Sequence, residues 1–197
     1  ISLEGNGVIL PSSQNLIFPF KAANLKAVDL KIIKIFENNL PRFFQENEIN
    51  GGYNLKPFGR PVYSGRVDLV NAPGMTAGGW NLYTIDLSDY INVEPGILYK
   101  VSLGMRRSYS LYPCTDTGEG SKYEELLQNS QELAGDFWDD PENYYNDSDD
   151  AIYYNAGFRW EDRNDPCKDA YYSPDKRVSK NILASNFGIM AKKGTDV

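Results

Sequence analysis

The residues best suited by type to chemistry are the carboxylates of residues 115–150. This stretch holds 12 Asp and Glu residues against a single Lys, a local net charge of −11 in a chain whose net charge is −7. Asp147, Asp149 and Asp150 offer the oxygen ligands that Ca²⁺ prefers. They lack the alternating Asp register and the closing Glu of a calcium-binding loop, so a solvated acidic surface outweighs a calcium site here.

No other part of the sequence presents a recognisable catalytic arrangement. Paired carboxylates can hydrolyse glycosides, but no spacing within the acidic stretch singles out one pair. The chain has no histidine, which removes the usual general base and metal ligand. Gly118 and Gly120 form a Gly-x-Gly that lacks the third glycine and the preceding strand of a phosphate-binding loop. The sequence therefore predicts a protein that is not an enzyme and has no cofactor or catalytic metal.

Aromatic residues are interspersed among the acids and follow them. Such side chains can form a platform for a sugar or a peptide, or they can supply the core of a segment that has little other apolar material. The second role is the more common one. The candidates for an interaction surface are Phe137, Trp138, Tyr144, Tyr145, Tyr153 and Tyr154, with Tyr171 and Tyr172 as further tyrosines of the same section.

Cys114 and Cys167 are the two cysteines of the chain, and they flank this polar section. Their spacing is not that of a zinc site, and no histidine completes one. In an oxidising compartment the natural interpretation is a disulfide that clamps the section at its base. In the cytosol they would be two free thiols. The chain-entropy model gives such a disulfide a stabilisation of roughly 4 kcal/mol.

Length and composition are those of a globular protein with a sizeable core. The chain has 197 residues, 41% of them hydrophobic, and its 14 tyrosines are typical of β-rich extracellular domains. The negative net charge argues against a nucleic-acid partner. No apolar run approaches 18 residues, so neither a membrane span nor a signal peptide is predicted. Because the first residue is Ile1 and not Met, we expect a processed protein or an excised piece.

The elements that would position these residues are organised around residues 97–111. Apolar and aromatic side chains alternate there with mostly polar ones, so that Ile97, Tyr99 and Val101 share one face. A period of two predicts one long, half-buried antiparallel strand, which we place at the centre of a sheet. Arg107 breaks the apolar face near the end, where a strand commonly leaves the core.

Other strands are predicted before and after this one, joined by turns that contain Gly or Pro. Within residues 25–36 the apolar face changes between Ile32 and Ile33, which predicts either a bulge or burial on both faces. Pro19 predicts an edge position or a strand end. The spacing of the strands predicts an all-β fold, an antiparallel β-sandwich of about seven strands. The remaining predicted elements are strands at 7–10, 15–20, 61–70 and 80–87, helical turns at 39–45 and 88–91, and turns at 50–52 and 94–96.

The character of the chain changes after Cys114, and residues 114–177 are interpreted as an acidic, partly helical insertion in the sandwich. Residues 121–133 begin with a capping box and predict a helix. Residues 152–154 and 158–160 would add a short hairpin. The insertion would be pinned at its base by the two cysteines.

The sandwich is predicted to resume with a final, bent strand at about 178–193. Residues 192–194 would then link it to whatever follows. We therefore expect a single domain over residues 1–197, which is a fragment of a larger multidomain protein.

Five stretches carry most of the strand-like sequence outside the insertion. They are NLKAVDLKIIKIFENN at 24–39, WNLYTIDLS at 80–88, EPGILYKVSL at 94–103, SYSLYPC at 108–114 and VSKNILASNFGIMAKKG at 178–194. Together they resemble an N-terminal macroglobulin-type domain of bacterial alpha-2-macroglobulin-like proteins, a seven-stranded sandwich related in shape to fibronectin type III domains.

The resemblance implies a large secreted or periplasmic parent protein of the bacterial cell envelope, with a lipid anchor as its only membrane contact. That family traps proteases: cleavage of a bait region triggers closure around the protease, often with an internal thioester. The thioester motif Cys-x-Glu-Gln is absent, because Cys114 precedes Thr-Asp-Thr and Cys167 precedes Lys-Asp-Ala. No bait segment is recognisable either. The resemblance therefore makes this chain a scaffold, with neighbouring macroglobulin domains as partners and target proteases engaged through the parent.

Two functions from different classes follow. The first is a non-enzymatic structural domain of a protease-trapping inhibitor. The alternative is an extracellular carbohydrate- or protein-binding β-sandwich that uses its Tyr/Trp-rich acidic insertion. A glycosidase is a distant third, since it would need two carboxylates facing each other across a cleft.

Overall fold

The structure is a computed structural model that describes residues 1–5, 9–10, 16–69, 78–115, 124, 159–173 and 176–185. Its strands are β1 (Ser2–Leu3), β2 (Ile9–Leu10), β3 (Ile17–Ala22), β4 (Ala27–Ile35), β5 (Gly59–Asp68), β6 (Asn81–Asp86), β7 (Leu98–Gly104) and β8 (Val178–Ala184). Its helical elements are the α-helix α1 (Leu40–Glu46) and the 3₁₀ turns η1 (Glu37–Asn39), η2 (Leu87–Asp89), η3 (Arg107–Tyr109), η5 (Trp160–Asn164) and η6 (Asp169–Tyr172).

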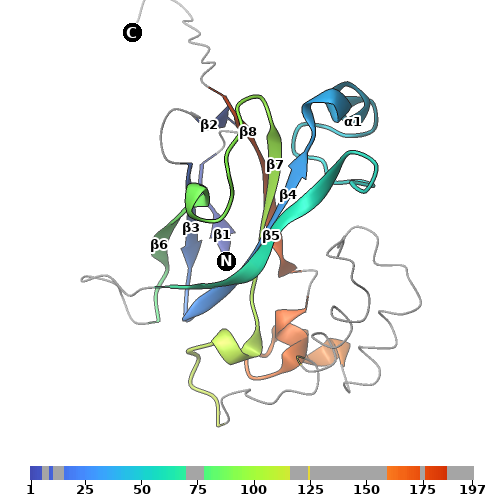
Figure 1. The fold of residues 1–197 in the computed structure, drawn as a ribbon. Coiled ribbons are helices and arrows are strands. Elements are labelled where there is room, and N and C mark those ends of the chain that lie inside the picture. The colour runs from blue at the N-terminus through green and yellow to red at the C-terminus, as the bar shows by residue number, and fades with distance from the viewer. Residues whose placement is uncertain are drawn as a thin grey trace, which may run out of the picture.

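The strands form two packed sheets, which confirms the predicted β-sandwich (Figure 1). One sheet has the order β1-β3-β6 and the other the order β2-β8-β7-β4-β5. All pairs are antiparallel except the short pair of β2 and β8, which is parallel. The segment with α1 and the segment with η5 and η6 lie at opposite ends of the sandwich (Figure 1).

The main core lies between the sheets, and the alternation of each strand decides which side chains enter it. β3 contributes Phe18 and Phe20, while β6 contributes Tyr83 and Ile85. From the opposing sheet come alternate residues of β4 and β7: Val28, Leu30, Ile32, Tyr99, Val101 and Leu103. Burial of this apolar surface is the main stabilising term of the fold.

A second cluster covers the outer face of the five-stranded sheet. It joins Ile33, Ile35 and Leu98 of the sheet to Phe43 of α1 and to Leu55 and Phe58 of the segment that follows. We call these six residues the outer core. Asn39 precedes α1 and makes no capping hydrogen bond with its side chain; instead, its side-chain amide donates to the carbonyl of Phe58 at 2.9 Å. The helix is thereby tied to the segment that it packs against.

β7 occupies the predicted central position, between β8 and β4, but two details of the prediction are wrong. The strand ends at Gly104 and not at residue 111, because residues 107–109 turn into η3. It is buried on both faces and not on one. Leu98 lies on the face that was predicted to be exposed to solvent, and the outer core covers it.

Of the two alternatives predicted for the change of face between Ile32 and Ile33, burial on both faces is confirmed and a bulge in this strand is not found. Ile32 lies in the main core and Ile33 in the outer core, so β4 is buried on both sides. The pairing with β7 is continuous, whereas the register with β5 shifts between these two residues. Val62 is the extra residue, so the bulge belongs to β5 and not to β4.

The prediction that Pro19 lies at a sheet edge or a strand end is wrong. β3 is the central strand of its sheet, and Pro19 lies in the middle of it. The carbonyl of Pro19 accepts from the amide of Glu4, so its nitrogen also points to the β1 side. Glu4 therefore lies opposite Pro19 just beyond the end of β1, and the reciprocal bond from position 19 is the one that proline cannot donate.

The other predicted elements are found close to their expected bounds. β2 and β3 fall at the strands expected at 7–10 and 15–20, and β5 and β6 at those expected at 61–70 and 80–87. The helical turn expected at 88–91 is η2, which begins one residue earlier, and Gly96 takes a φ of 79° in the turn before β7. The side chains of β6 alternate between the core and solvent: Tyr83 and Ile85 are buried while Leu82 is 57% exposed.

Much of the predicted insertion lies outside the described residues. This holds for the helix at 121–133 except Glu124, and for the hairpin except at its end, where Trp160 begins a 3₁₀ turn and not a strand. The described part of the final strand is β8, which ends at Ala184. The assignment of residues 1–197 to a single domain of a larger protein stays a prediction.

Candidate functional site

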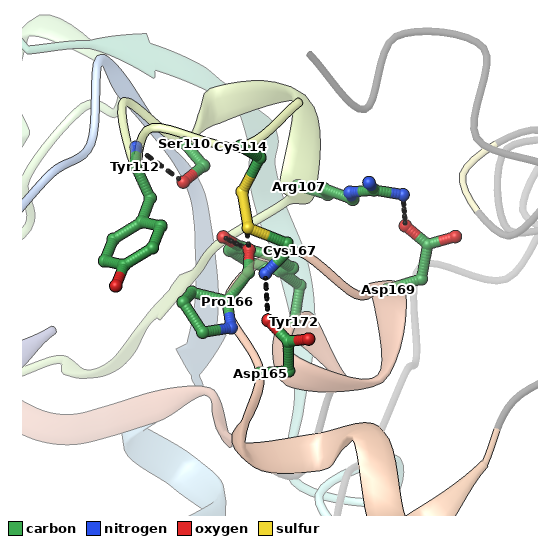
Figure 2. The surroundings of a disulfide bond; sticks show 9 residues. All are labelled: Arg107, Ser110, Tyr112, Cys114, Asp165, Pro166, Cys167, Asp169 and Tyr172. Atoms are coloured by element: carbon green, nitrogen blue, oxygen red, sulfur yellow. Dashed lines mark hydrogen bonds and ion pairs between the residues drawn. A yellow bond between two sulfur atoms is a disulfide. The ribbon is translucent and has the colours of Figure 1, made fainter. Parts of the chain in front are cut away.

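A disulfide between Cys114 and Cys167 joins the chain after η3 to the chain between η5 and η6 (Figure 2). The two Cα atoms are 5.6 Å apart, and the cysteines are separated by 53 positions in the sequence. The predicted disulfide is confirmed, whereas the interpretation of residues 114–177 as an insertion stays a prediction. We call its surroundings, the described residues 106–114 and 159–173, the junction.

Hydrogen bonds around the disulfide hold the two segments that it joins. The amide of Cys167 donates to Asp165 at 2.9 Å, and the hydroxyl of Tyr172 donates to the carbonyl of Pro166 at 2.6 Å (Figure 2). Tyr172 is buried, and burial raises the pKa of its hydroxyl. The ring of Tyr171 packs edge-on against it. Tyr172 is therefore packed in the core of the junction, whereas Tyr171 is partly exposed.

Two side chains from later in the sequence, Asp169 and Glu124, contact η3. The guanidinium of Arg107 lies 3.5 Å from the carboxylate of Asp169 in η6. The amide and hydroxyl of Ser108 donate to the two carboxylate oxygens of Glu124, at 2.9 and 2.7 Å. Arg107, which broke the apolar pattern of the sequence, therefore marks the point where the chain leaves β7 and enters the junction.

On the other side of η3, Asp29 of β4 accepts two hydrogen bonds. Arg106 donates through Nε at 2.6 Å, and the hydroxyl of Tyr109 donates at 2.9 Å. The guanidinium groups of Arg66 and Arg106 lie 5.0 and 5.8 Å from the centre of the Tyr109 ring. These four residues, the Asp29 network, fix the end of β7 against its neighbouring strands.

The electrostatics of the Asp29 network favour a structural role. Burial raises the pKa of Tyr109 well above its ordinary value, and the negative charge of Asp29 raises it further. Burial is the largest single influence on Arg106 and lowers its pKa. The charge of Asp29 and the hydrogen bond to it, with smaller contributions from Tyr109 and Glu124, together outweigh burial, so the pKa is raised. Tyr109 stays a neutral donor and Arg106 a cation at any physiological pH. Neither group is poised to act as a base or a nucleophile.

Raising the pH above about 10 is expected to destabilise the fold. Burial raises the pKa values of Tyr99, Tyr109 and Tyr172, so these groups keep their protons in the folded protein after the unfolded chain has lost them. The unfolded state then binds fewer protons, and stability falls by up to about 1.4 kcal/mol per pH unit for each such tyrosine. Urea unfolding followed by circular dichroism on either side of that pH measures the slope. Tyr109→Phe should make the decline shallower, and a slope equal to that of the wild type would contradict this assignment.

The residues that the sequence offered for ligand binding lie outside the described residues. This applies to the calcium candidates Asp147, Asp149 and Asp150, and to the surface candidates Phe137, Trp138, Tyr144, Tyr145, Tyr153 and Tyr154. Their roles stay predictions. Within the described ranges, no group of three or more Cys, Asp and Glu side chains is arranged to hold a metal ion.

Two surfaces or clusters were not anticipated from the sequence. The Asp29 network is one, because nothing in the alternation of residues 25–36 distinguishes Asp29 from the other polar residues of that strand. The other is the outer face of the three-stranded sheet, where Ile17 is 41% and Leu82 57% exposed, with Trp80 at 59% just before β6. Ile17 is paired with Asp86 and Leu82 with Lys21, so Leu82 and Trp80 lie toward one end of this face and Ile17 toward the other.

The described residues thus form an all-β sandwich in which a disulfide joins the segment after η3 to the segment between η5 and η6. Comparison with protein-family models gives no match, and neither does comparison with curated protein sequences. Among solved structures, a fragment of native alpha-2-macroglobulin from Escherichia coli that spans domains NIE-MG1 is similar, with 21% sequence identity and a TM-score of 0.37. The match covers 45% of this chain and 43% of that fragment, and this degree of likeness does not establish a family. In the described part of the chain no helix is long and apolar enough to cross a membrane.

Proposed function

We propose that this chain is a non-enzymatic structural domain of an alpha-2-macroglobulin-like protein that traps proteases. The proposal is carried by the location of the stretches that resemble a macroglobulin-type domain. They contain β4 at 24–39, β6 at 80–88, most of β7 at 94–103, most of η3 with Cys114 at 108–114, and β8 at 178–194. β8, β7 and β4 are adjacent in one sheet, and β6 belongs to the sheet packed against it. The resemblance thus runs through the framework of one sandwich.

The packing suits a scaffold. β4 and β7 are buried on both faces, and the Asp29 network and the disulfide fix the end of β7. A stiff unit of this kind moves as a rigid body, so a row of such domains can transmit a rearrangement through its interfaces. In a protease trap, the bait region and the closing movement would come from other parts of the parent protein.

The proposed partners and location follow from the same features. The outer face of the three-stranded sheet, with Ile17, Trp80 and Leu82, would contact a neighbouring macroglobulin domain of the same chain. Target proteases would be reached through the parent, and the net charge of −7 disfavours nucleic acid. The disulfide supports an oxidising location, the bacterial periplasm or cell surface. A lipid anchor of the parent would be its membrane contact.

The test compares the isolated chain with its full-length parent. The parent should block the cleavage of large protein substrates by a protease and leave the cleavage of a small peptide substrate largely unaffected, because a trapped protease keeps its active site. The isolated chain should inhibit neither reaction. A parent that leaves the cleavage of large substrates unchanged would rule out the trap.

Calorimetry on the isolated chain distinguishes the alternative function, an extracellular carbohydrate- or protein-binding module that uses the acidic insertion. Micromolar-to-millimolar binding of a glycan that is lost in Tyr144→Ala or Tyr153→Ala would favour that alternative. Binding of Ca²⁺ that is lost in Asp147→Asn or Asp149→Asn would do the same. Release of reducing sugar from a glycan would instead overturn the non-enzymatic proposal.

A further inference from the structure

The loop of residues 47–53, which follows α1, is closed by one of its own side chains. The side-chain oxygen of Asn47 accepts from the amide of Tyr53 at 2.7 Å, and the side-chain nitrogen donates to the carbonyl of Tyr53 at 3.1 Å. This pair of bonds joins the two ends of the loop.

A buried residue from the far end of the sequence holds the same loop to the sheet. Asn181 of β8 is fully buried, and its side-chain nitrogen donates to the carbonyls of Ile49 and Gly51, each at 2.8 Å. Its side-chain oxygen has no hydrogen-bond partner among the described residues. Both hydrogens of the buried amide are thus donated to one loop and hold it against the sheet. We call this pair of hydrogen bonds the latch.

The latched loop contains the dipeptide Asn50-Gly51. Only glycine fits at position 51, because a Cβ there would lie 2.8 Å from Cβ of Asn47 and 3.0 Å from the carbonyl oxygen of Glu48. The side chain of Asn50 is exposed, and no hydrogen bond to it is found within the described part of the chain. The fold therefore requires the glycine but gives no reason for the asparagine before it.

We propose that Asn50 is a site of spontaneous deamidation, which the latch of Asn181 and the closure by Asn47 keep slow in the folded protein. The backbone nitrogen of Gly51 attacks Cγ of Asn50, a C–N bond forms, and the side-chain nitrogen leaves as ammonia. Water then opens the resulting succinimide at one of its two carbonyls and gives aspartate or isoaspartate. Glycine as the following residue offers the least steric hindrance to this attack, since it has no Cβ.

In the closed loop the attacking nitrogen is engaged elsewhere. The amide of Gly51 donates to the carbonyl of Glu48 at 2.8 Å, and the carbonyls on either side of Asn50 are held by Asn181. Ring closure requires these groups to rotate, so the reaction proceeds from the fraction of molecules in which the loop has opened. The rate at Asn50 is then a measure of loop opening.

Deamidation would in turn weaken the latch. Isoaspartate inserts one extra main-chain carbon between two carbonyls that Asn181 fixes, and either product adds a negative charge to the loop. The loop leads directly to Leu55 and Phe58 of the outer core. A modified chain should therefore cover the outer face of the five-stranded sheet less well than an unmodified one.

The test follows deamidation of Asn50 by peptide mapping and mass spectrometry during incubation in mildly alkaline buffer. The folded wild type should react at least about tenfold more slowly at Asn50 than the same chain in urea, since only open loops react. Asn181→Ala should raise the folded-state rate to within about threefold of the urea rate, because the loop then opens readily. The control is Ile32→Val, which perturbs the main core and leaves the loop contacts in place, and it should keep the wild-type rate.

Equal rates in the folded and urea-unfolded chain would overturn the proposal, as would an Asn181→Ala rate equal to that of the wild type. If Asn181→Ala fails to fold, two other measurements decide the question. Asn47→Ala should accelerate the reaction from the other side of the loop. In the wild type, hydrogen exchange at the Gly51 amide should be slowed by the same factor as deamidation, and an unprotected amide would contradict the latch.

Discussion

Replacing Cys114 and Cys167 together by serine is expected to lower the free energy of unfolding by about 4 kcal/mol. The disulfide closes a loop across 53 sequence positions, so its loss frees a long segment in the unfolded chain. The contacts of Arg107 with Asp169 and of Ser108 with Glu124 remain, so the sandwich itself should still fold. Most of the loss would therefore come from the larger entropy of the unfolded state.

Urea unfolding of three samples checks this prediction: the oxidised wild type, the reduced wild type and the double variant. The reduced wild type and the variant should have the same midpoint, well below that of the oxidised protein. The dependence of the free energy on urea should be steeper without the disulfide, because the uncrosslinked chain exposes more surface on unfolding. A double variant within about 1 kcal/mol of the oxidised wild type would show that the clamp contributes little.

Phe43→Ala is expected to cost about 3–5 kcal/mol, whereas Phe44→Ala at the next position should cost less than about 1 kcal/mol. Both residues are on α1, but Phe43 is fully buried in the outer core and Phe44 is 48% exposed. The ring of Phe43 packs edge-on against Phe58 with centroids 5.8 Å apart. Its removal leaves a cavity that the surrounding residues can fill only in part.

The two phenylalanine variants are matched in chemistry, helix position and size of the change, so burial is what differs between them. Urea unfolding gives the two costs, and hydrogen exchange shows where the protection is lost. Exchange in Phe43→Ala should rise in α1 and the 47–53 loop before it rises in β7. Equal costs for the two variants would mean that the outer core does not stabilise the fold.

Several features could be predicted from the sequence because they depend on local pattern. The apolar pattern of residues 25–36 predicted β4, with burial on both faces as one of two alternatives, and a helical turn was predicted at 39–45, where α1 lies. The alternation in 80–87 separated buried Tyr83 from exposed Leu82. Two cysteines around a polar section were enough to predict the clamp. The strand and helix patterns each lie within a few neighbouring residues. The disulfide could be predicted because paired cysteines in an oxidising compartment commonly form one.

Other features needed the pairing of distant strands. The sequence predicted that β7 was half-buried and ran to residue 111, because alternation cannot show that α1 and the following segment fold back over the outer face. The prediction for Pro19 was wrong because the sequence does not show that β3 lies between β1 and β6. Nor does it show that β1 is too short to reach Pro19.

By itself, then, the sequence determined an all-β sandwich with a disulfide-clamped acidic section and no evident catalytic group, because backbone alternation, turns and cysteine chemistry act over short range. Only the tertiary structure decided which polar residues matter. Asp29 meets Arg106 across 77 positions, and Asn181 meets Ile49 across 132. Such pairs depend on strand order and register, which place residues side by side regardless of their separation in the chain.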